Sequence, residues 1–194
     1  MVDYRKIAIR TLETPRLLLR PILASDASRI QSLFSNPKVL QYLHAGLPIP
    51  YPEDGALEFL SRVLPRVEAG EEYLWVLLRK ENPEEGMIGQ ISLTPKGEDD
   101  HRGFWLGEPY WEQGYMKEAV GAVNDFAFDE LKMDHLLLNN AEPNVASHRL
   151  KESCGAEIIG RYEKEFVGGL FTSVRWKLTA DAWRKYRSGE HGSL

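Results

Sequence analysis

Apolar and polar positions alternate along this chain with two periods. Between Ala119 and Leu131 apolar residues recur every three to four positions, which predicts a helix with one buried face. Shorter apolar runs have the length and composition of strands; they lie at Leu17–Arg20, Tyr73–Leu78, Met87–Leu93, Phe104–Leu106 and Leu136–Leu138. Two further runs, Ile158–Val167 and Phe171–Leu178, predict a hairpin around Gly168 and Gly169.

Four more helices are predicted, over Asp26–Phe34, Ala56–Glu68, Val145–Cys154 and Ala180–Arg187. Ser25 and Asn144 precede two of them and are expected N-caps, since their side chains can accept from first-turn N–H groups. Asn36-Pro37 is expected to end the first helix, and Gly155 the third. Pro65 should kink or shorten the second.

This order of elements predicts an α/β sandwich with a mixed, mostly antiparallel sheet of about six or seven strands flanked by helices. The segment from Phe104 to Leu138 is the one β-α-β crossover, so its two strands are expected to be parallel neighbours. The segment Lys96–Arg102 is interpreted as a charged turn.

Composition narrows the function. The 194 residues suit one domain over 1–194, with a polar tail expected to be disordered from about residue 188. A net charge of -5 argues against a general nucleic-acid binder.

The single cysteine, Cys154, excludes an intramolecular disulfide and fits a reducing cytosol. No apolar run is long enough for a membrane helix or a signal core, so we expect a cytoplasmic protein without a membrane partner. Five scattered histidines argue against a metal site.

The run from Phe104 to Gly121 carries the clearest functional signal. It reads as a short strand, a turn rich in Gly and Pro, then a glycine, Gly114, that opens an amphipathic helix. The first turn of a helix has unpaired N–H groups and a partial positive charge, so it can hold a phosphate or pyrophosphate. A glycine before a helix is common, however, and the pattern alone is weak.

Four stretches together resemble the GNAT (Gcn5-related) N-acetyltransferases, and among them the RimJ/RimL-like branch. They are TPRLLLRP, GFWLGEPYWEQGYMKEAV, EPNVASHRLKESCGAEIIG and SVRWKLTADAW, and they cover almost the whole chain in order. The second and third are fairly specific as a pair. The resemblance implies a GNAT-like sandwich, acetyl-CoA as co-substrate, no metal, and transfer of an acetyl group to an amine.

The family's pyrophosphate loop, [Q/R]-x-x-G-x-[G/A], falls on Trp111–Met116. The resemblance implies that cofactor contacts come from Gln113, Gly114, Tyr115, Met116 and Lys117. Three residues depart from the pattern. Trp111 replaces Gln or Arg, as is usual in the branch; Met116 replaces a small residue, so its side chain must point away from the phosphates; and Glu112 places a negative charge near an anion site, which Lys117 can offset.

In this family the strand at Phe104–Gly107 splays from the next one, and the pantetheine arm fills the gap like an added strand. By resemblance Trp105, Leu106 and Gly107 supply the unpaired backbone groups; their side chains can equally be core packing. Asn144 and Ser147 match the branch's N-x-x-S. Asn144 would bond the pantetheine amide, and Ser147 would protonate the departing thiolate, although a plain helix cap is the local alternative.

The chemistry requires an amine that has lost its proton, attack on the thioester carbonyl, an oxyanion held by backbone N–H, and release of a thiol. The sequence does not single out a general base. His101 has the most suitable pKa and is our candidate, although an exposed turn histidine is more often inert. Glu108 flanks the same strand, and Asp99, Asp100 and Glu142 lie on neighbouring loops.

The acceptor is an amine-bearing small molecule or a protein N-terminus, bound between walls that include Tyr42, His44, Tyr51 and Phe171. The chain is expected to be a monomer or a homodimer. Two other classes stay open: a non-catalytic acyl-CoA sensor, and an unrelated phosphate-binding module. The absence of a P-loop motif and of a doubly wound pattern argues against the second.

Overall fold

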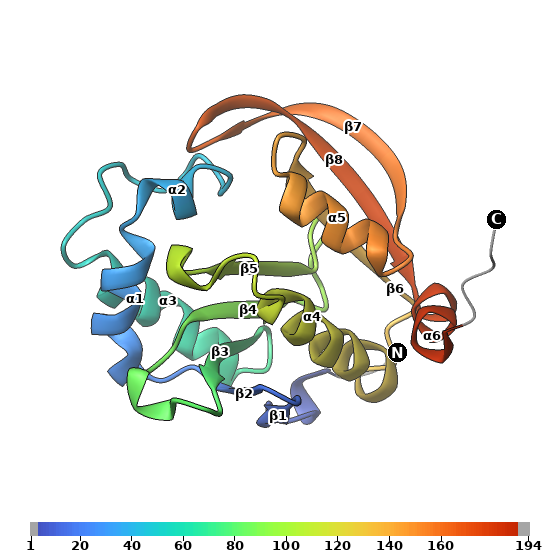
Figure 1. Ribbon diagram of the computed structural model, residues 1–194, viewed down its shortest axis with the longest axis horizontal. Helices are drawn as coiled ribbons and strands as arrows, with labels where there is room; N and C mark the ends of the chain where they lie inside the picture. The colour runs from blue at the N-terminus through green and yellow to red at the C-terminus, as the bar shows by residue number, and fades with distance from the viewer. Residues whose placement is uncertain (1–3, 190–194) are drawn as a thin grey trace.

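The computed structural model describes residues 4–189 and contains two antiparallel sheets (Figure 1). The first has the order β1-β2-β3-β4-β5, with β1 at Leu12–Glu13, β2 at Leu17–Pro21, β3 at Tyr73–Arg79, β4 at Gly89–Leu93 and β5 at Arg102–Leu106. The second has the order β6-β8-β7, with β6 at His135–Ala141, β7 at Glu157–Phe166 and β8 at Gly169–Thr179. The α/β sandwich expected from the sequence is confirmed, with eight strands in the described part of the chain where about six or seven were expected.

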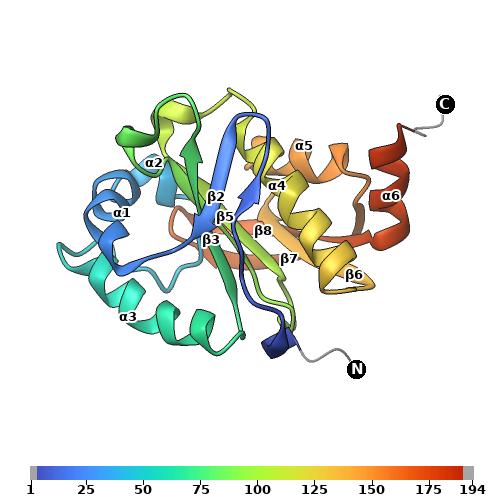
Figure 2. The ribbon, with the colours of Figure 1, turned by 90° about the horizontal axis from the view of Figure 1, so that it is seen from below.

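Helices cover both faces of the first sheet (Figure 2). On one face lie α1 (Ala27–Phe34) and α3 (Gly55–Glu68), with the short α2 (Pro37–Leu40) beyond them; on the other lies α4 (Tyr115–Asp125), which continues as a π-helical turn over Phe126–Glu130. Two helices accompany the second sheet: α5 (Val145–Ser153) and α6 (Ala180–Ser188).

The two faces have separate cores, and β3 contributes to both. Trp75 and Leu77 pack into the core under α4, whereas Leu74 and Val76 pack into the core under α1 and α3. Because successive side chains of a strand point to opposite faces, a strand buried on both sides is apolar throughout. This explains the unbroken run Tyr73–Leu78.

The first helix ends before Asn36-Pro37 as expected, but three details at the helix boundaries differ from the sequence interpretation. Ser25 is not an N-cap: it lies in a 3-10 turn before α1, and the Asp26 carboxylate accepts the Leu23 N–H at 2.8 Å instead. Asn36 begins the short α2, where it accepts the Lys38 N–H at 3.0 Å. Pro65 does not shorten α3, which runs on to Glu68.

The parallel strand pair expected from the crossover is wrong, because β5 and β6 belong to different sheets. Within the described residues they are joined at His101. Its N–H donates to the Leu137 carbonyl at 2.8 Å, and its Nδ1 accepts the Leu137 N–H at 2.8 Å. The segment read as a charged turn therefore ends in a junction between sheets, where His101 and Arg102 are buried. Among residues 4–189, no strand pairs with the second edge of β5 beyond the junction.

The tail was expected to be disordered from about residue 188. Ser188 is the last residue of α6, and residues 190–194 lie outside the described part of the chain. Within residues 4–189, none of the helices combines the length and apolar character that crossing a bilayer requires.

Candidate functional site

The first turn of α4 has backbone N–H groups that are not bonded within the helix. Gly114 is its N-cap, with φ 79°, and the first helical hydrogen bond runs from the Glu118 N–H to the Gly114 carbonyl. The N–H groups of Tyr115, Met116 and Lys117 therefore have no carbonyl partner within the helix. The Tyr115 and Met116 side chains are buried in the core.

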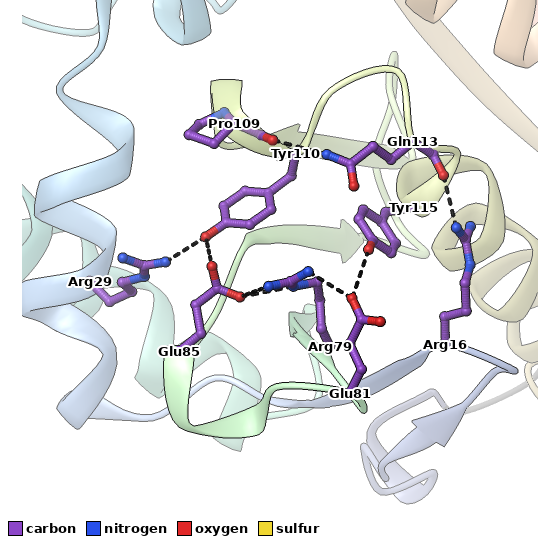
Figure 3. A network of polar contacts seen from close by, with 9 residues as sticks. All are labelled: Arg16, Arg29, Arg79, Glu81, Glu85, Pro109, Tyr110, Gln113 and Tyr115. Carbon is purple, nitrogen blue, oxygen red and sulfur yellow. Dashed lines mark hydrogen bonds and ion pairs between the residues drawn. The ribbon is translucent and has the colours of Figure 1, made fainter.

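Arg16, just before β2, ties this loop to the sheet (Figure 3). It donates to the Gln113 carbonyl at 2.9 Å, forms an ion pair with Glu118 at 2.7 Å, and lies 4.6 Å from the Tyr115 ring centroid. The Gln113 side chain turns back to the Pro109 carbonyl at 3.0 Å. The loop is therefore held in one conformation from both sides.

A second set of polar contacts supports the loop from below (Figure 3). The Tyr110 hydroxyl accepts from Arg29 at 2.8 Å and donates to Glu85, which also binds Arg79. The hydrogen bond from Tyr110 lowers the pKa of the Glu85 carboxyl, and Arg79 lowers it further, against the opposing effect of burial. Glu81 accepts from Arg79 at 2.7 Å. The charges under the loop are thus paired with one another.

Glu112 and Lys117 both lie at the surface of the loop. Glu112 has φ 60°, an uncommon conformation for a residue with a side chain. Its exposure means that its charge is directed to solvent and not into the core.

The open edge of β5 is made by different residues from those expected. The Gly107 N–H donates to Ile88, and the His101 carbonyl accepts from Thr94, so positions 101, 103, 105 and 107 face β4. Backbone direction alternates along an antiparallel strand, so Phe104 and Leu106 turn their groups to the other edge. Of the three residues expected at this edge, Leu106 faces it. Trp105 and Gly107 were wrong, because their backbone groups face β4. Phe104, which was not expected, faces the open edge.

Trp111 is linked to this edge. Its indole Nε1 donates to the Leu106 carbonyl at 2.7 Å. Trp111, which replaces the Gln or Arg of the family's loop, therefore has a structural role. It joins the loop to the end of β5.

The N-terminus of α5 provides the third part of the site. Asn144 is its N-cap and accepts the Ser147 N–H at 3.1 Å, as expected. Ser147 is buried, and its Oγ accepts a hydrogen bond from the Lys151 Nζ at 2.6 Å. Sequence reasoning missed Lys151, although it follows Ser147 at helical spacing; the two form the buried face of α5, and Cys154 at its C-cap is buried as well.

His101 is not an exposed turn residue, so that expectation is wrong. It is 8% exposed, and burial lowers its pKa, with His135 nearby adding to the effect. Because Nδ1 accepts the Leu137 N–H, the neutral ring carries its proton on Nε2 and has no free lone pair. The geometry supports a structural role and not that of a general base.

Three of the other candidate bases are engaged in ion pairs, and the fourth, Asp100, accepts the Arg102 N–H at 3.4 Å, while burial raises its pKa to about 6. Glu108 pairs with Lys38 and accepts from Asn36 at 2.6 Å, and both contacts lower its pKa. Asp99 pairs with Arg175 at 2.9 Å, and Glu142 with Arg161 at 3.5 Å.

The two expected acceptor walls contact each other. The Gly168 N–H at the β7–β8 turn donates to Gln41 at 2.8 Å, and the Tyr42 and Phe171 rings meet edge-on at 6.0 Å. His44 forms a β-bridge with Phe166. Figure 1 shows the hairpin arching over α5 toward α2.

Tyr51 differs from the other three wall residues. Its ring packs on Phe34 of α1, with the ring centroids 5.1 Å apart, so it belongs to the core on that side.

Among residues 4–189, no group of three or more His, Cys, Asp or Glu is placed to hold a metal ion.

Comparison with known proteins identifies the class. Residues 16–157 match the family model described as an acetyltransferase (GNAT) domain, so the chain belongs to the GNAT family. It is 28% identical over 150 residues to "Uncharacterized N-acetyltransferase YoaA" of Bacillus subtilis (strain 168), covering 77% of this chain and 84% of that one. The chain is an acetyl-CoA-dependent acetyltransferase.

Solved structures with this fold include two complexes with coenzyme A. One is RimL, a ribosomal L7/L12 alpha-N-protein acetyltransferase in complex with coenzyme A, with TM-score 0.75 and 16% identity over 89% of this chain and 99% of RimL. The other is spermidine N-acetyltransferase from Vibrio cholerae in complex with CoA and spermine, with TM-score 0.71 and 19% identity over 87% and 98%. The expected resemblance to the RimJ/RimL-like branch is thus confirmed in the fold.

Proposed function

We propose that this protein transfers the acetyl group of acetyl-CoA directly to a primary amine, in a complex that holds both substrates. The observation that carries the proposal is the placement of free backbone donors at the start of α4, next to the open edge of β5. Supporting it, the RimL relative of the same fold was solved with coenzyme A.

The residues present fit such a ligand. The N–H groups of 115–117 would bind the pyrophosphate, with Gly114 giving the close approach that a side chain would obstruct. Phe104 and Leu106 would pair with the pantetheine amides at the β5 edge, and Asn144 would lie at the start of α5 on the opposite side. Lys117, exposed on the first turn, would contribute positive charge toward the phosphates.

The transfer needs two proton movements. The amine must be neutral when it attacks, and the sulfur must gain a proton when it leaves. We assign the second to Ser147, whose hydroxyl lies in the first turn of α5. For the first, we assign no base: His101 has no free lone pair, Glu108, Asp99 and Glu142 are paired, and the Asp100 carboxylate accepts the Arg102 N–H. The acceptor would then lose its proton to water.

Without a general base, an acceptor whose ammonium group has a low pKa is favoured. A peptide α-amine has a pKa near 8, whereas a lysine or polyamine amine lies near 10, so at neutral pH the free fraction differs by about a hundredfold. We therefore propose a protein N-terminus, or a small molecule with an equally acidic ammonium group, as the acceptor. The residues of the Tyr42–Phe171 contact would line its path.

The binding part is tested by thermal unfolding with coenzyme A, acetyl-CoA and ATP. At a ligand concentration about one hundred times Kd, coenzyme A should add about 2.7 kcal/mol to the free energy of unfolding. ATP lacks the pantetheine arm and should add much less. Equal stabilisation by ATP, or none by coenzyme A, would contradict the assignment.

The acceptor is tested with a panel of N-terminal peptides, polyamines and aminoglycosides. We expect acetylated peptide, with kcat/KM falling below about pH 8 in proportion to the free amine. A preference for polyamines at neutral pH would show that a base operates. No acetylated product with any amine would favour a binding protein without catalysis.

A further inference from the structure

Lys151 of α5 is a buried amine next to the proposed proton donor. Its side chain is among the largest fully buried ones and is 2% exposed. It lies one helical turn after Ser147, and its Nζ donates to the Ser147 Oγ at 2.6 Å. The Nζ also lies 5.6 Å from the ring centroid of Phe104, a residue of the open β5 edge.

The charges around this amine are unbalanced. Arg102 of β5 is buried nearby, and two of its nitrogens, Nε and Nη2, have no hydrogen-bond partner in the described part of the chain. Asp100 supplies the opposing charge, and Cys154, the C-cap of α5, also acts on this amine. Burial lowers the pKa of the Lys151 amine, and Arg102 lowers it further, while Asp100 and Cys154 act in the opposite direction.

A lysine is a costly residue for such a position. A buried ammonium needs hydrogen bonds to all three of its protons to balance its desolvation, and apolar residues of similar volume are often tolerated as well or better. For Lys151 the hydrogen bond found among the described residues is the one to Ser147. Its placement is therefore poorly explained by packing alone.

We propose that Lys151 is a positioning residue that orients the Ser147 hydroxyl and replaces the proton which Ser147 gives to the leaving sulfur. The inference rests on the proposed function, which places Ser147 at that sulfur. The Lys151 N–H occupies a lone pair of Oγ, so the hydroxyl proton points away from Lys151.

The proton balance closes within the reaction. The amine nitrogen forms a bond to the acetyl carbon and the C–S bond breaks. The Ser147 O–H proton passes to sulfur, and a Lys151 proton passes to Ser147. The attacking nitrogen releases its extra proton to water, and Lys151 regains one from water. The net products are the acetylated amine and the free thiol.

The lowered pKa suits this task. A thiol has a pKa near 8.5 and an ordinary lysine near 10.4, so an ordinary ammonium is about two pH units too weak an acid to protonate a thiolate. The buried position of Lys151 brings the two groups closer in acidity, and the Asp100 charge keeps the ammonium from losing its proton too early.

The test is Lys151→Met, with Lys185→Met of the exposed face of α6 as control. Under chemistry-limited conditions with both substrates saturating, we expect kcat of Lys151→Met to fall about a hundredfold, the lower end of the range for general acid–base catalysis. KM for acetyl-CoA should change by less than about threefold. Adding Ser147→Ala should lower kcat little further, since both residues serve one step. Unchanged kcat in Lys151→Met, or full additivity, would overturn the proposal.

A pH profile provides the measurement that a structural role would not move. Wild-type kcat should decline on the alkaline side as Lys151 loses its proton, and this decline should be absent in Ser147→Ala. This arm stands even where Lys151→Met fails to fold. A wild-type profile without the decline, or one retained in Ser147→Ala, would refute the relay. Failure of coenzyme A binding or of acetylation in the wild type would instead refute the proposed function.

Discussion

Gly114 offers the sharpest test of how the site is built. Adding a methyl group in Gly114→Ala meets Arg16 Nη2 at 3.4 Å, which is ordinary van der Waals contact, so space is available. The conformation is the difficulty: φ is 79° at this position, and a left-handed conformation costs a residue with a Cβ about 1–2 kcal/mol. We expect the free energy of unfolding to fall by about that amount.

Gly121 provides a matched control in the same helix. A Cβ added there meets nothing within 4 Å, and the residue has an ordinary helical conformation. Gly121→Ala should therefore stabilise the protein by about 1 kcal/mol, the usual difference in helix propensity. For a chain of this size each kcal/mol shifts Tm by roughly 2–4 °C, so the two variants should move in opposite directions.

Coenzyme A binding separates strain from function. The Gly114→Ala turn can relieve its strain by rotating the peptide, which turns first-turn N–H groups away from the phosphates. Losing one hydrogen bond to a charged group costs about 1.5–3 kcal/mol, or tenfold and more in Kd. Gly121→Ala should bind normally, and Gly114→Val should be worse than Gly114→Ala because its side chain is β-branched. Calorimetric titration that found equal Kd for Gly114→Ala and wild type would refute this account of the loop.

Three further predictions concern the surrounding residues. Ser147→Ala should lower turnover with little change in coenzyme A binding, because its proton transfer matters in the transition state; full turnover in a chemistry-limited assay would reduce it to a helix-turn residue. Arg16→Met should weaken coenzyme A binding several-fold through loss of its bond to the Gln113 carbonyl, whereas the exposed Arg184→Met should not; titration of both variants checks this. The pKa of His101 is lowered in the folded state, so its contribution to stability is present above about pH 6.5 and is lost as pH falls toward its folded pKa. His101→Asn keeps an acceptor for the neighbouring strand and does not titrate, so urea unfolding at pH 7 and 5 should show a smaller loss of stability in the variant than in wild type.

Much of the fold could be predicted from the sequence because the strongest patterns are local. The apolar run Tyr73–Leu78 became β3 with one residue more, and the stripe from Ala119 to Leu131 became α4 and its π-helical continuation. Predictions failed where a tertiary contact decided the outcome. Ser25 has the chemistry of an N-cap, but Asp26 is held by Arg20 and takes that position.

The site shows the same division. Gly114 and Asn144 are recognisable because turn and cap chemistry constrain residue type directly. Which residues of β5 face the open edge depends on register with β4, and a sequence does not specify that parity. His101 looked exposed because its neighbours are polar. Its burial follows from the contact with Leu137, thirty-six positions away.

The departures from the loop motif follow from what the loop presents. Its binding groups are backbone N–H donors, so the side chains are free to take other positions: Met116 fills the core, and Trp111 bonds to the Leu106 carbonyl. Such a site can change sequence and keep its ligand. The α5 part of the site works through side chains instead, in the contact of Ser147 with Lys151. Binding and turnover should therefore respond to different sets of substitutions: backbone geometry at Gly114 for the first, and the chemistry of Ser147 and Lys151 for the second.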